Sequence, residues 1–368
     1  MKILVVAVAA LTASPLAAQE APVQPPEQVA VEPEPTPPSP DEAAPDLPEE
    51  DGDGRIVGGD TAARKDGLWQ AEIFTIGEGL YTDAEVKEDS AKLNTDLTKK
   101  GLSHKPKWEQ SHRCGGALIP GNWVVTAAHC VVLPCPEKPC LAPDQFLQRR
   151  GVRLGTLNID GRGQTYRIER AVIDGRYSKA KKVYDMALLK IVPDGKPARL
   201  DFMPVPIRIL GSKPGDLPLM RNPNLAATGW GLTGARADGP KRPQVDREGK
   251  PINRASPVLK IVSLKLLPQE GRCQQEYPAA MIPQVICAGS KPGEDTCQGD
   301  SGGPLTRAEG TERVLVGLVS GGKGCAIAGM PGLYVNVTEY RRWIEEAKAA
   351  SKAGRVVDYP KQPGTASR

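Results

Sequence analysis

The amino-acid sequence predicts an all-β body that ends in a single helix. Short runs rich in Val, Ile and Leu recur after residue 55 and are bounded by Gly, Pro and Asn, a pattern typical of β-sandwiches and barrels. Only residues 339–352 have a helical spacing of apolar side chains. The length after residue 55 is sufficient for one large or two small hydrophobic cores. The apolar runs are GALI, WVVTAA, RAVI, MALLKIV, LKIVSLKLL, VLVGLVS and LYVNV.

Residues 1–18, MKILVVAVAALTASPLAA, predict a secretory signal peptide. One Lys precedes an apolar run, and small residues surround a cleavage site after Ala18. The run is too short to act as a membrane anchor, and no other stretch approaches the length of a membrane span. We therefore expect an exported protein, secreted or periplasmic, without a membrane partner.

The eight cysteines, an even number, indicate disulfides in an oxidising compartment. No CxxC pair has the spacing of a zinc site, and the chain has only three histidines. The sequence therefore predicts neither a metal nor another cofactor.

Residues 19–55 predict a disordered, acidic, Pro-rich prosegment. Its low hydrophobicity and high charge leave too little apolar surface to offset the entropy of ordering. It holds no cysteine, so a cut after it would release it completely. Residues 1–55 contain 11 of the 44 acidic residues and two of the 48 basic residues, so the body that follows is markedly basic.

A basic body is also expected of an exported protein that binds nucleic acid or an anionic surface. Here Lys and Arg are scattered among Asp and Glu, and the chain has only three Phe, five Trp and eight Tyr. No basic strip is interleaved with aromatic side chains on which bases would stack. We therefore favour a solvated basic surface and predict no nucleic-acid partner.

Ser301 lies in a glycine-rich frame, GDSGGP, over residues 299–304. Such a cluster is typical of a turn, but glycines also let backbone amides face an oxyanion while a serine attacks a carbonyl. Among the three histidines, only His129 is well anchored, after the apolar run WVVTAA and beside a cysteine. Asp185 opens the apolar run MALLKIV, where an ionised carboxylate needs a partner.

Together these segments resemble the chymotrypsin-type (trypsin-like) serine protease family. The resemblance extends from Ile56 to about Ala350, with the motifs in the family's order. It implies two six-stranded antiparallel β-barrels packed together, followed by the C-terminal α-helix. The matching segments are IVGG at 56–59, TAAHC at 126–130, DMALL at 185–189, GWG at 229–231, DTCQGDSGGP at 295–304, and VSGGKGC with PGLY within 319–334.

The resemblance implies the roles of the catalytic residues. Ser301 would be the nucleophile, His129 the general base and then acid, and Asp185 the group that orients the imidazole. The backbone amides of Gly299 and Ser301 would form the oxyanion hole. Ser320 matches the family's serine that hydrogen-bonds the triad aspartate.

The resemblance also implies substrate and activation. Asp295 matches the floor of the primary pocket, and Gly322 and Gly332 match its walls, which predicts cleavage after Arg or Lys. A cut between Arg55 and Ile56 would activate a zymogen, because the new ammonium group would pair with Asp300. We expect a monomer that acts on protein or peptide substrates and is bound by protein inhibitors. The alternative is an exported basic binding protein of this fold with little activity.

The resemblance further implies three disulfides: Cys114 with Cys130, Cys273 with Cys287, and Cys297 with Cys325. Cys135 and Cys140 would form a small local bridge or remain free thiols. Leu225, Val262 and Arg307 stand where many relatives have cysteines, so bridges there are absent. Gly321 replaces the usual Trp, so an extended-substrate preference does not follow from the resemblance.

The predicted organisation places the first barrel at 56–203 and the second barrel with its helix at 204–352. Polar insertions at about 78–111 and 235–256 would be either disordered excursions or walls that set specificity. Residues 353–368 are expected to form a flexible tail.

Overall fold

The computed structural model describes residues 56–57, 59–76, 106–132, 147–178, 183–195, 198–233, 255–277, 284–289, 294–327, 329–350 and 354–359. The predicted signal peptide and prosegment, Cys135 and Cys140 lie outside these residues, as does most of each predicted insertion. Both sheets belong to one compact unit, Gly52–Arg368. No described helix has both the length and the apolar character that a membrane span requires.

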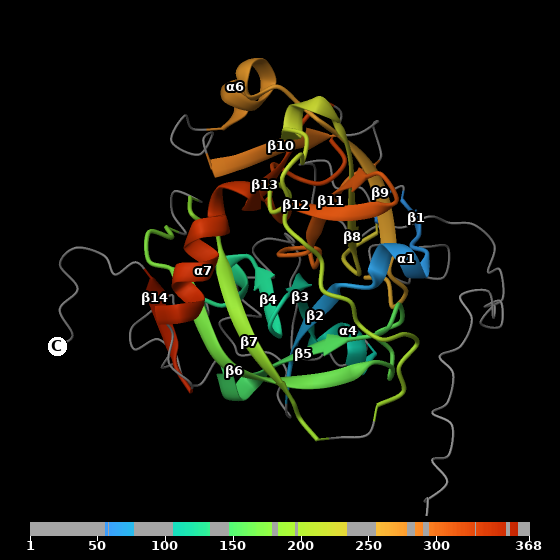
Figure 1. Cartoon of the computed structure of the whole chain (residues 1–368). Helices are drawn as coiled ribbons and strands as arrows, with labels where there is room; N and C mark the ends of the chain where they lie inside the picture. The colour runs from blue at the N-terminus through green and yellow to red at the C-terminus, as the bar shows by residue number, and fades with distance from the viewer. Residues whose placement is uncertain are drawn as a thin grey trace, which may run out of the picture. The chain divides into compact units, whose positions relative to one another are not determined.

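The first barrel has six antiparallel strands in the order β6-β5-β2-β3-β4-β7, and the pairing of β6 with β7 closes it (Figure 1). Closure leaves no exposed strand edge along the paired stretches, which stabilises the sheet. The strands are β2 (Gln70–Thr75), β3 (His112–Ile119), β4 (Trp123–Thr126), β5 (Arg150–Leu154), β6 (Gln164–Asp174) and β7 (Ala187–Pro193).

The second barrel follows the order β9-β10-β13-β12-β11-β8, closed by β8 with β9, and a short strand β1 (Asp60–Thr61) adds to β9. In β9, Val262 and Leu264 are buried while Ser263 and Lys265 face solvent, as the twofold period of a strand requires. The strands are β8 (Asn224–Gly229), β9 (Lys260–Leu266), β10 (Val285–Gly289), β11 (Pro304–Glu309), β12 (Glu312–Gly321) and β13 (Gly332–Asn336).

These two barrels and the C-terminal helix confirm the predicted fold class. The helix begins with a 3₁₀ turn, η5 (Val337–Tyr340), and continues as α7 (Arg341–Ala350). Other described helical segments are short and include α1 (Arg64–Gly67), α4 (Lys107–Ser111), η1 (Ala128–Cys130), η2 (Leu219–Arg221), η3 (Gln269–Cys273) and α6 (Gln274–Glu276).

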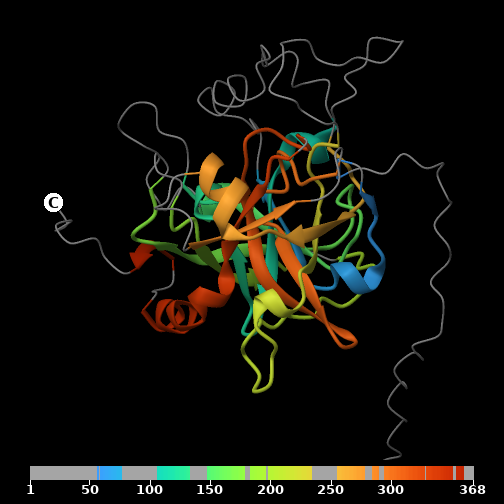
Figure 2. The same cartoon turned by 90° about the horizontal axis from the view of Figure 1, so that it is seen from above.

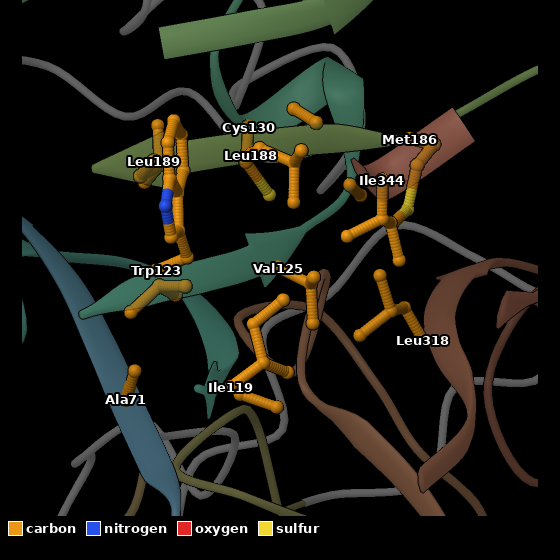
Figure 3. Close-up of a cluster of buried hydrophobic side chains, with 14 of the residues drawn as sticks. Ala71, Ile119, Trp123, Val125, Cys130, Met186, Leu188, Leu189, Leu318 and Ile344 are labelled. Carbon is orange, nitrogen blue, oxygen red and sulfur yellow. The ribbon is translucent and has the colours of Figure 1, made fainter. Parts of the chain in front are cut away.

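One hydrophobic cluster joins the two barrels. It contains side chains of the first barrel, Leu315, Leu318 and Val335 of the second barrel, and one face of α7. Figure 3 shows Leu318 and Ile344 beside Val125 of β4. Because each fully buried aliphatic side chain contributes about 1.5–3 kcal/mol, this cluster is a substantial source of docking energy between the barrels.

The predicted flexible tail differs from the structure at residues 356–359. These residues form β14 (Val356–Tyr359), which pairs in parallel with β6 from Ala171 to Asp174 (Figures 1 and 2). Strand β5 pairs only with residues 164–167 of β6, so the later part of that edge is open to another strand.

The crossover between the barrels uses backbone hydrogen bonds to both. The Ile207 amide donates to Leu118 of the first barrel, and the Leu210 amide donates to Leu315 of the second. The boundary near residue 204 stays a prediction.

The described end of the first insertion includes α4, whose Trp108 packs against a cluster that contains Trp230.

Candidate active site

His129 and Asp185 meet because their strands are neighbours. Strand β4 leads into η1, which carries His129, and Asp185 closely precedes β7; in the β4–β7 register Thr126 lies opposite Ala187. The Asp185 carboxylate accepts the His129 backbone N–H at 2.9 Å and lies 2.8 Å from Nδ1 of the same residue. One carboxylate therefore fixes both the backbone and the ring of His129.

The carboxylate of Asp185 also accepts a hydrogen bond from Ser320 Oγ in β12, at 2.6 Å. Burial alone would raise the pKa of Asp185, but the charge and hydrogen bonds of His129 and the Ser320 hydroxyl lower it below its usual value. An ionised carboxylate at Nδ1 requires the proton on that nitrogen, so Nε2 is the nitrogen left to act as a base. Within the described residues, Nε2 has no hydrogen-bond partner.

Ser301 lies against the segment that carries His129. Its carbonyl accepts the Gly115 amide at 2.8 Å, and Cys130 Sγ is 3.6 Å from the same oxygen. Gly302 follows with φ +76°. A Cβ at this residue would clash with the Thr126 hydroxyl and would lie 3.0 Å from the backbone nitrogen of Ala127. Only glycine permits this close approach of the Ser301 turn to the end of β4.

Two backbone amides of the turn at Ser301 are without an acceptor in the described part of the chain. The Gln298 carbonyl accepts the Leu232 amide at 2.7 Å, and in a trans peptide the Gly299 N–H must then point in the opposite direction. Gly299 has φ +94°. Within the described residues, neither the Gly299 nor the Ser301 N–H has a hydrogen-bond acceptor. Two neighbouring amides of this kind are suited to stabilise an oxyanion.

His112 also reaches this turn, although its place in the sequence indicates only a polar stretch. Its buried ring lies 3.0 Å from the Gly299 carbonyl through Nε2 and 3.2 Å from Glu72 Oε1 through Nδ1. Arg153 donates to the other oxygen of Glu72 at 2.8 Å. The register between β2 and β3 shifts between Ile73 and Phe74, so His112 lies opposite Phe74 and on the face of Glu72, a placement that strict alternation along HRCGGALI does not signal.

Asp295 lies in a buried position beside two glycines. Its carboxylate accepts the amides of Ala326 and Thr296 at 3.0 and 2.8 Å. A Cβ on Gly332 would lie 3.4 Å from Asp295 Oδ1, and one on Gly322 would lie 3.8 Å from the Cα of Gly332. Burial raises the pKa of Asp295 to about 6, despite these hydrogen bonds. Among the described residues it has no cationic partner, so the arrangement suits a cation from outside.

Asp300 is fully buried, and its two oxygens accept the amides of Gly231 and Cys297, each at 2.8 Å. Burial raises the pKa of Asp300 to about 6. No described Lys, Arg or His side chain forms an ion pair with it. Ile56 is buried in the second barrel, and the Val57 carbonyl accepts the Asp295 amide at 3.0 Å. The start of the predicted mature chain therefore runs beside the Asp295–Asp300 segment.

The structure contains the three disulfides that the resemblance implies. Cys114–Cys130 joins β3 to η1, and Cys297–Cys325 joins the Asp295 segment to the one that carries Ala326. The described residues place Cys114, Cys130 and His129 close together, but the two bonded sulfurs cannot serve as thiolate ligands of a metal.

Two positions at which the sequence departs from the family pattern, Arg307 and Gly321, have structural consequences. Arg307, opposite Leu225 in the β8–β11 register, is fully buried and donates to the carbonyls of residues 217, 218 and 219. Its guanidinium thus ties that loop to the barrel. At Gly321, a Cβ would meet no described atom within 4 Å, so none of the described residues occupies the position of the missing Trp.

Comparison with known proteins identifies the family. Residues 96–344, more than half of the chain, match the family described as Trypsin, and this range includes His129, Asp185 and Ser301. Human kallikrein-14 (Homo sapiens) is 34% identical over 240 residues, which cover 63% of this chain and 73% of the relative. The chain therefore belongs to the trypsin family of serine proteases.

Proposed function

We propose that this protease is a secreted endopeptidase that cleaves peptide bonds after Arg or Lys and is made as a zymogen. The main support for the catalytic role is the carboxylate of Asp185, which hydrogen-bonds both the backbone N–H and the ring Nδ1 of His129 beside the Ser301 turn. Export is supported by the predicted signal peptide and by the disulfides of the described chain. The preference for a basic residue is supported by the burial of Asp295 without a described cationic partner.

In the proposed mechanism, Ser301 Oγ attacks the scissile carbonyl while His129 Nε2 accepts the hydroxyl proton. The amides of Gly299 and Ser301 stabilise the tetrahedral oxyanion, and a lost donor of this kind typically costs about 3 kcal/mol of transition-state stabilisation. His129 then gives the proton to the leaving amine, and the acyl group stays on Ser301. A water activated by the same imidazole releases the acid and regenerates the enzyme.

The enzymatic activity is tested by a fluorophosphonate, which reacts only with an activated serine. The form that begins at Ile56 is expected to become labelled stoichiometrically at Ser301. Ser301→Ala protein is the control and should stay unlabelled. An unlabelled Ile56 form that hydrolyses no peptide would favour the alternative, a basic binding protein of this fold, over the protease.

Activation is proposed to follow a cut between Arg55 and Ile56. The new ammonium group of Ile56 would pair with Asp300, which is buried without a described cation partner. Because a buried charge without its partner typically costs about 3–5 kcal/mol, the uncut chain should keep a poorly formed oxyanion hole. A cut after Arg also makes self-activation feasible, restrained by the acidic residues before it, Glu49, Glu50, Asp51 and Asp53.

Arg55→Gln protein with its prosegment intact is therefore expected to show less than about 1% of the kcat/KM of the Ile56 form, since a defect of about 3 kcal/mol is more than a hundredfold in rate. Both forms are assayed at equal protein concentration on one Arg peptide. Arg64→Gln is the matched control, because Arg64 lies beyond the activation site and its loss should leave activation intact. Equal activity of the uncut and cut forms would exclude this activation mechanism.

A further inference from the structure

Arg176 and Asp174 form a tight pair at the end of β6. The carboxylate of Asp174 is fully buried, and it accepts three hydrogen bonds from Arg176: the backbone amide and Nε at 2.9 Å, and Nη2 at 2.8 Å. The side chain of Arg176 is 45% exposed, so part of its guanidinium remains accessible. The fork geometry fixes the plane of the guanidinium, which a single contact would not do.

The guanidinium of Arg176 lies over the ring of Tyr184, with Cζ 4.2 Å from the ring centroid. Tyr184 has φ +55°, a left-handed conformation that a bulky side chain rarely adopts. Its side chain also packs against a cluster that contains Cys273, Tyr277 and Cys287 of the second barrel. Tyr184 thus contacts both the first-barrel guanidinium and the second barrel.

The left-handed Tyr184 immediately precedes Asp185. The Met186 amide donates to the Tyr184 carbonyl at 2.8 Å, and this bond closes a three-residue turn with Asp185 at its centre. The Asp174 amide in turn donates to the Met186 carbonyl at 3.0 Å. Asp174 and its pair with Arg176 therefore border both sides of the turn from which the Asp185 carboxylate reaches His129.

We propose that Arg176 is a positioning residue for the protease reaction: fixed by Asp174, it holds Tyr184 in the left-handed conformation that directs Asp185 at His129. The proposal rests on the proposed catalytic role of Asp185. An exposed ion pair by itself contributes little. Here the pair is anchored on a fully buried carboxylate and covers a strained residue, so its loss lets the backbone at Tyr184 relax.

The test uses the Ile56 form of the full chain, with the active-site concentration measured by fluorophosphonate titration. Arg176→Ala is expected to lower kcat per titrated site by about 10-fold and to change KM by less than about twofold, since misalignment affects the chemical step. Tyr184→Asn, which adopts the left-handed conformation without the ring stack, should keep kcat within about twofold of the wild type. Tyr184→Phe keeps the ring and should retain most of the activity.

Two further variants separate positioning from general stability. Arg170→Ala removes a guanidinium from the ring of Trp123, 5.3 Å away; Arg170 lies within β6, before the strand ends, and away from the Asp185 turn. It should leave kcat unchanged even where the melting temperature falls. Arg176→Lys, which keeps the charge without the planar stack, provides a folded comparison if Arg176→Ala is unstable, with an expected loss of about threefold.

The double variant Arg176→Ala/Tyr184→Asn should keep the kcat of Tyr184→Asn, because the left-handed conformation of Asn does not depend on the guanidinium. An unchanged kcat per titrated site in Arg176→Ala or Arg176→Lys, with only a lower melting temperature, would overturn the positioning role while leaving the protease assignment intact. A wild-type Ile56 form that is neither labelled nor active would overturn the proposed function, and this inference with it.

Discussion

Replacing Asp185 with Asn is expected to lower kcat by about 10⁴-fold, the loss typical of this substitution in a Ser-His-Asp triad. The carboxylate now faces Nδ1 of His129, and it also accepts the Ser320 hydroxyl through the same oxygen. An amide of the same shape can place an N–H against Nδ1, which favours the tautomer with the proton on Nε2. That tautomer cannot accept the Ser301 proton.

The measurement is kcat per labelled or titrated active site, with KM determined in parallel. Asp201→Asn is a matched control, because Asp201 is also a hydrogen-bonded carboxylate of this unit but pairs with Arg162 and Thr156 instead. The control should keep wild-type kcat. A kcat of Asp185→Asn within about tenfold of wild type would mean that Asp185 does not set the tautomer of His129.

Residues of the candidate site could be predicted from the sequence where the neighbouring residues in the chain show why the side chain is there. Ser301 is framed by glycines, and the structure uses the left-handed conformation of Gly299 and Gly302 to shape that turn. Asp185 opens an apolar run, and the structure gives its buried carboxylate three hydrogen bonds. In both cases a few neighbouring residues show the physical need, for a tight turn at Ser301 and for a hydrogen-bond partner at Asp185.

Prediction from sequence fails where a residue owes its position to contacts with a segment far away in the chain. His112 is separated by 40 residues from Glu72 and by 187 from Gly299, so nothing local indicates that its ring will be buried between them. The Arg176–Tyr184 contact depends on the antiparallel bridge between Ser178 and Val183, which composition does not reveal. The strand at 356–359 escapes prediction because VVDY resembles any short apolar tail until an open edge of β6 is known.

The open position at Gly321 is a departure that the sequence did show. A Cβ at this residue meets nothing within 4 Å, so no described side chain has moved in to replace the usual Trp. Nearby Lys323 pairs with Glu276 at 3.1 Å and lies over the ring of Tyr277. We therefore expect substrate residues before the cut to meet a charged, hydrated border instead of an aromatic surface.

Replacing Asp295 with Ser is expected to abolish the preference of the enzyme for substrates with Arg or Lys before the cut. In the wild type, an apolar side chain would leave the Asp295 carboxylate desolvated and unpaired, a penalty of about 3–5 kcal/mol. At about 1.4 kcal/mol for each factor of ten, kcat/KM for Arg peptides should exceed that for matched Leu or Phe peptides by about a thousandfold. In Asp295→Ser this ratio should fall to near or below one.

The same carboxylate predicts a pH dependence. Burial raises the pKa of Asp295 to about 6, so in the free enzyme the group is ionised above that pH and becomes neutral as the pH falls through it. A substrate guanidinium favours the ionised form, which means that the loss at low pH belongs to kcat/KM and not to kcat. The ratio of kcat/KM for an Arg peptide to that for a matched Ala peptide cancels every pH effect that the two substrates share. This ratio should decrease below about pH 6 in the wild type but not in Asp295→Ser.

Glu294→Gln is the matched control for both measurements, because it removes the neighbouring acid without touching the carboxylate between Ala326 and Thr296. It should keep the Arg preference and its pH dependence. Gly332→Ala adds an independent check, since its Cβ would lie 3.4 Å from Asp295 Oδ1 and should hinder the entry of a long basic side chain. Two results would show that Asp295 does not select the substrate: equal cleavage of Leu or Phe peptides and Arg peptides by the wild type, or unimpaired cleavage of Arg peptides by Asp295→Ser. A buried carboxylate that binds the substrate guanidinium cannot be removed without weakening the cleavage of Arg peptides.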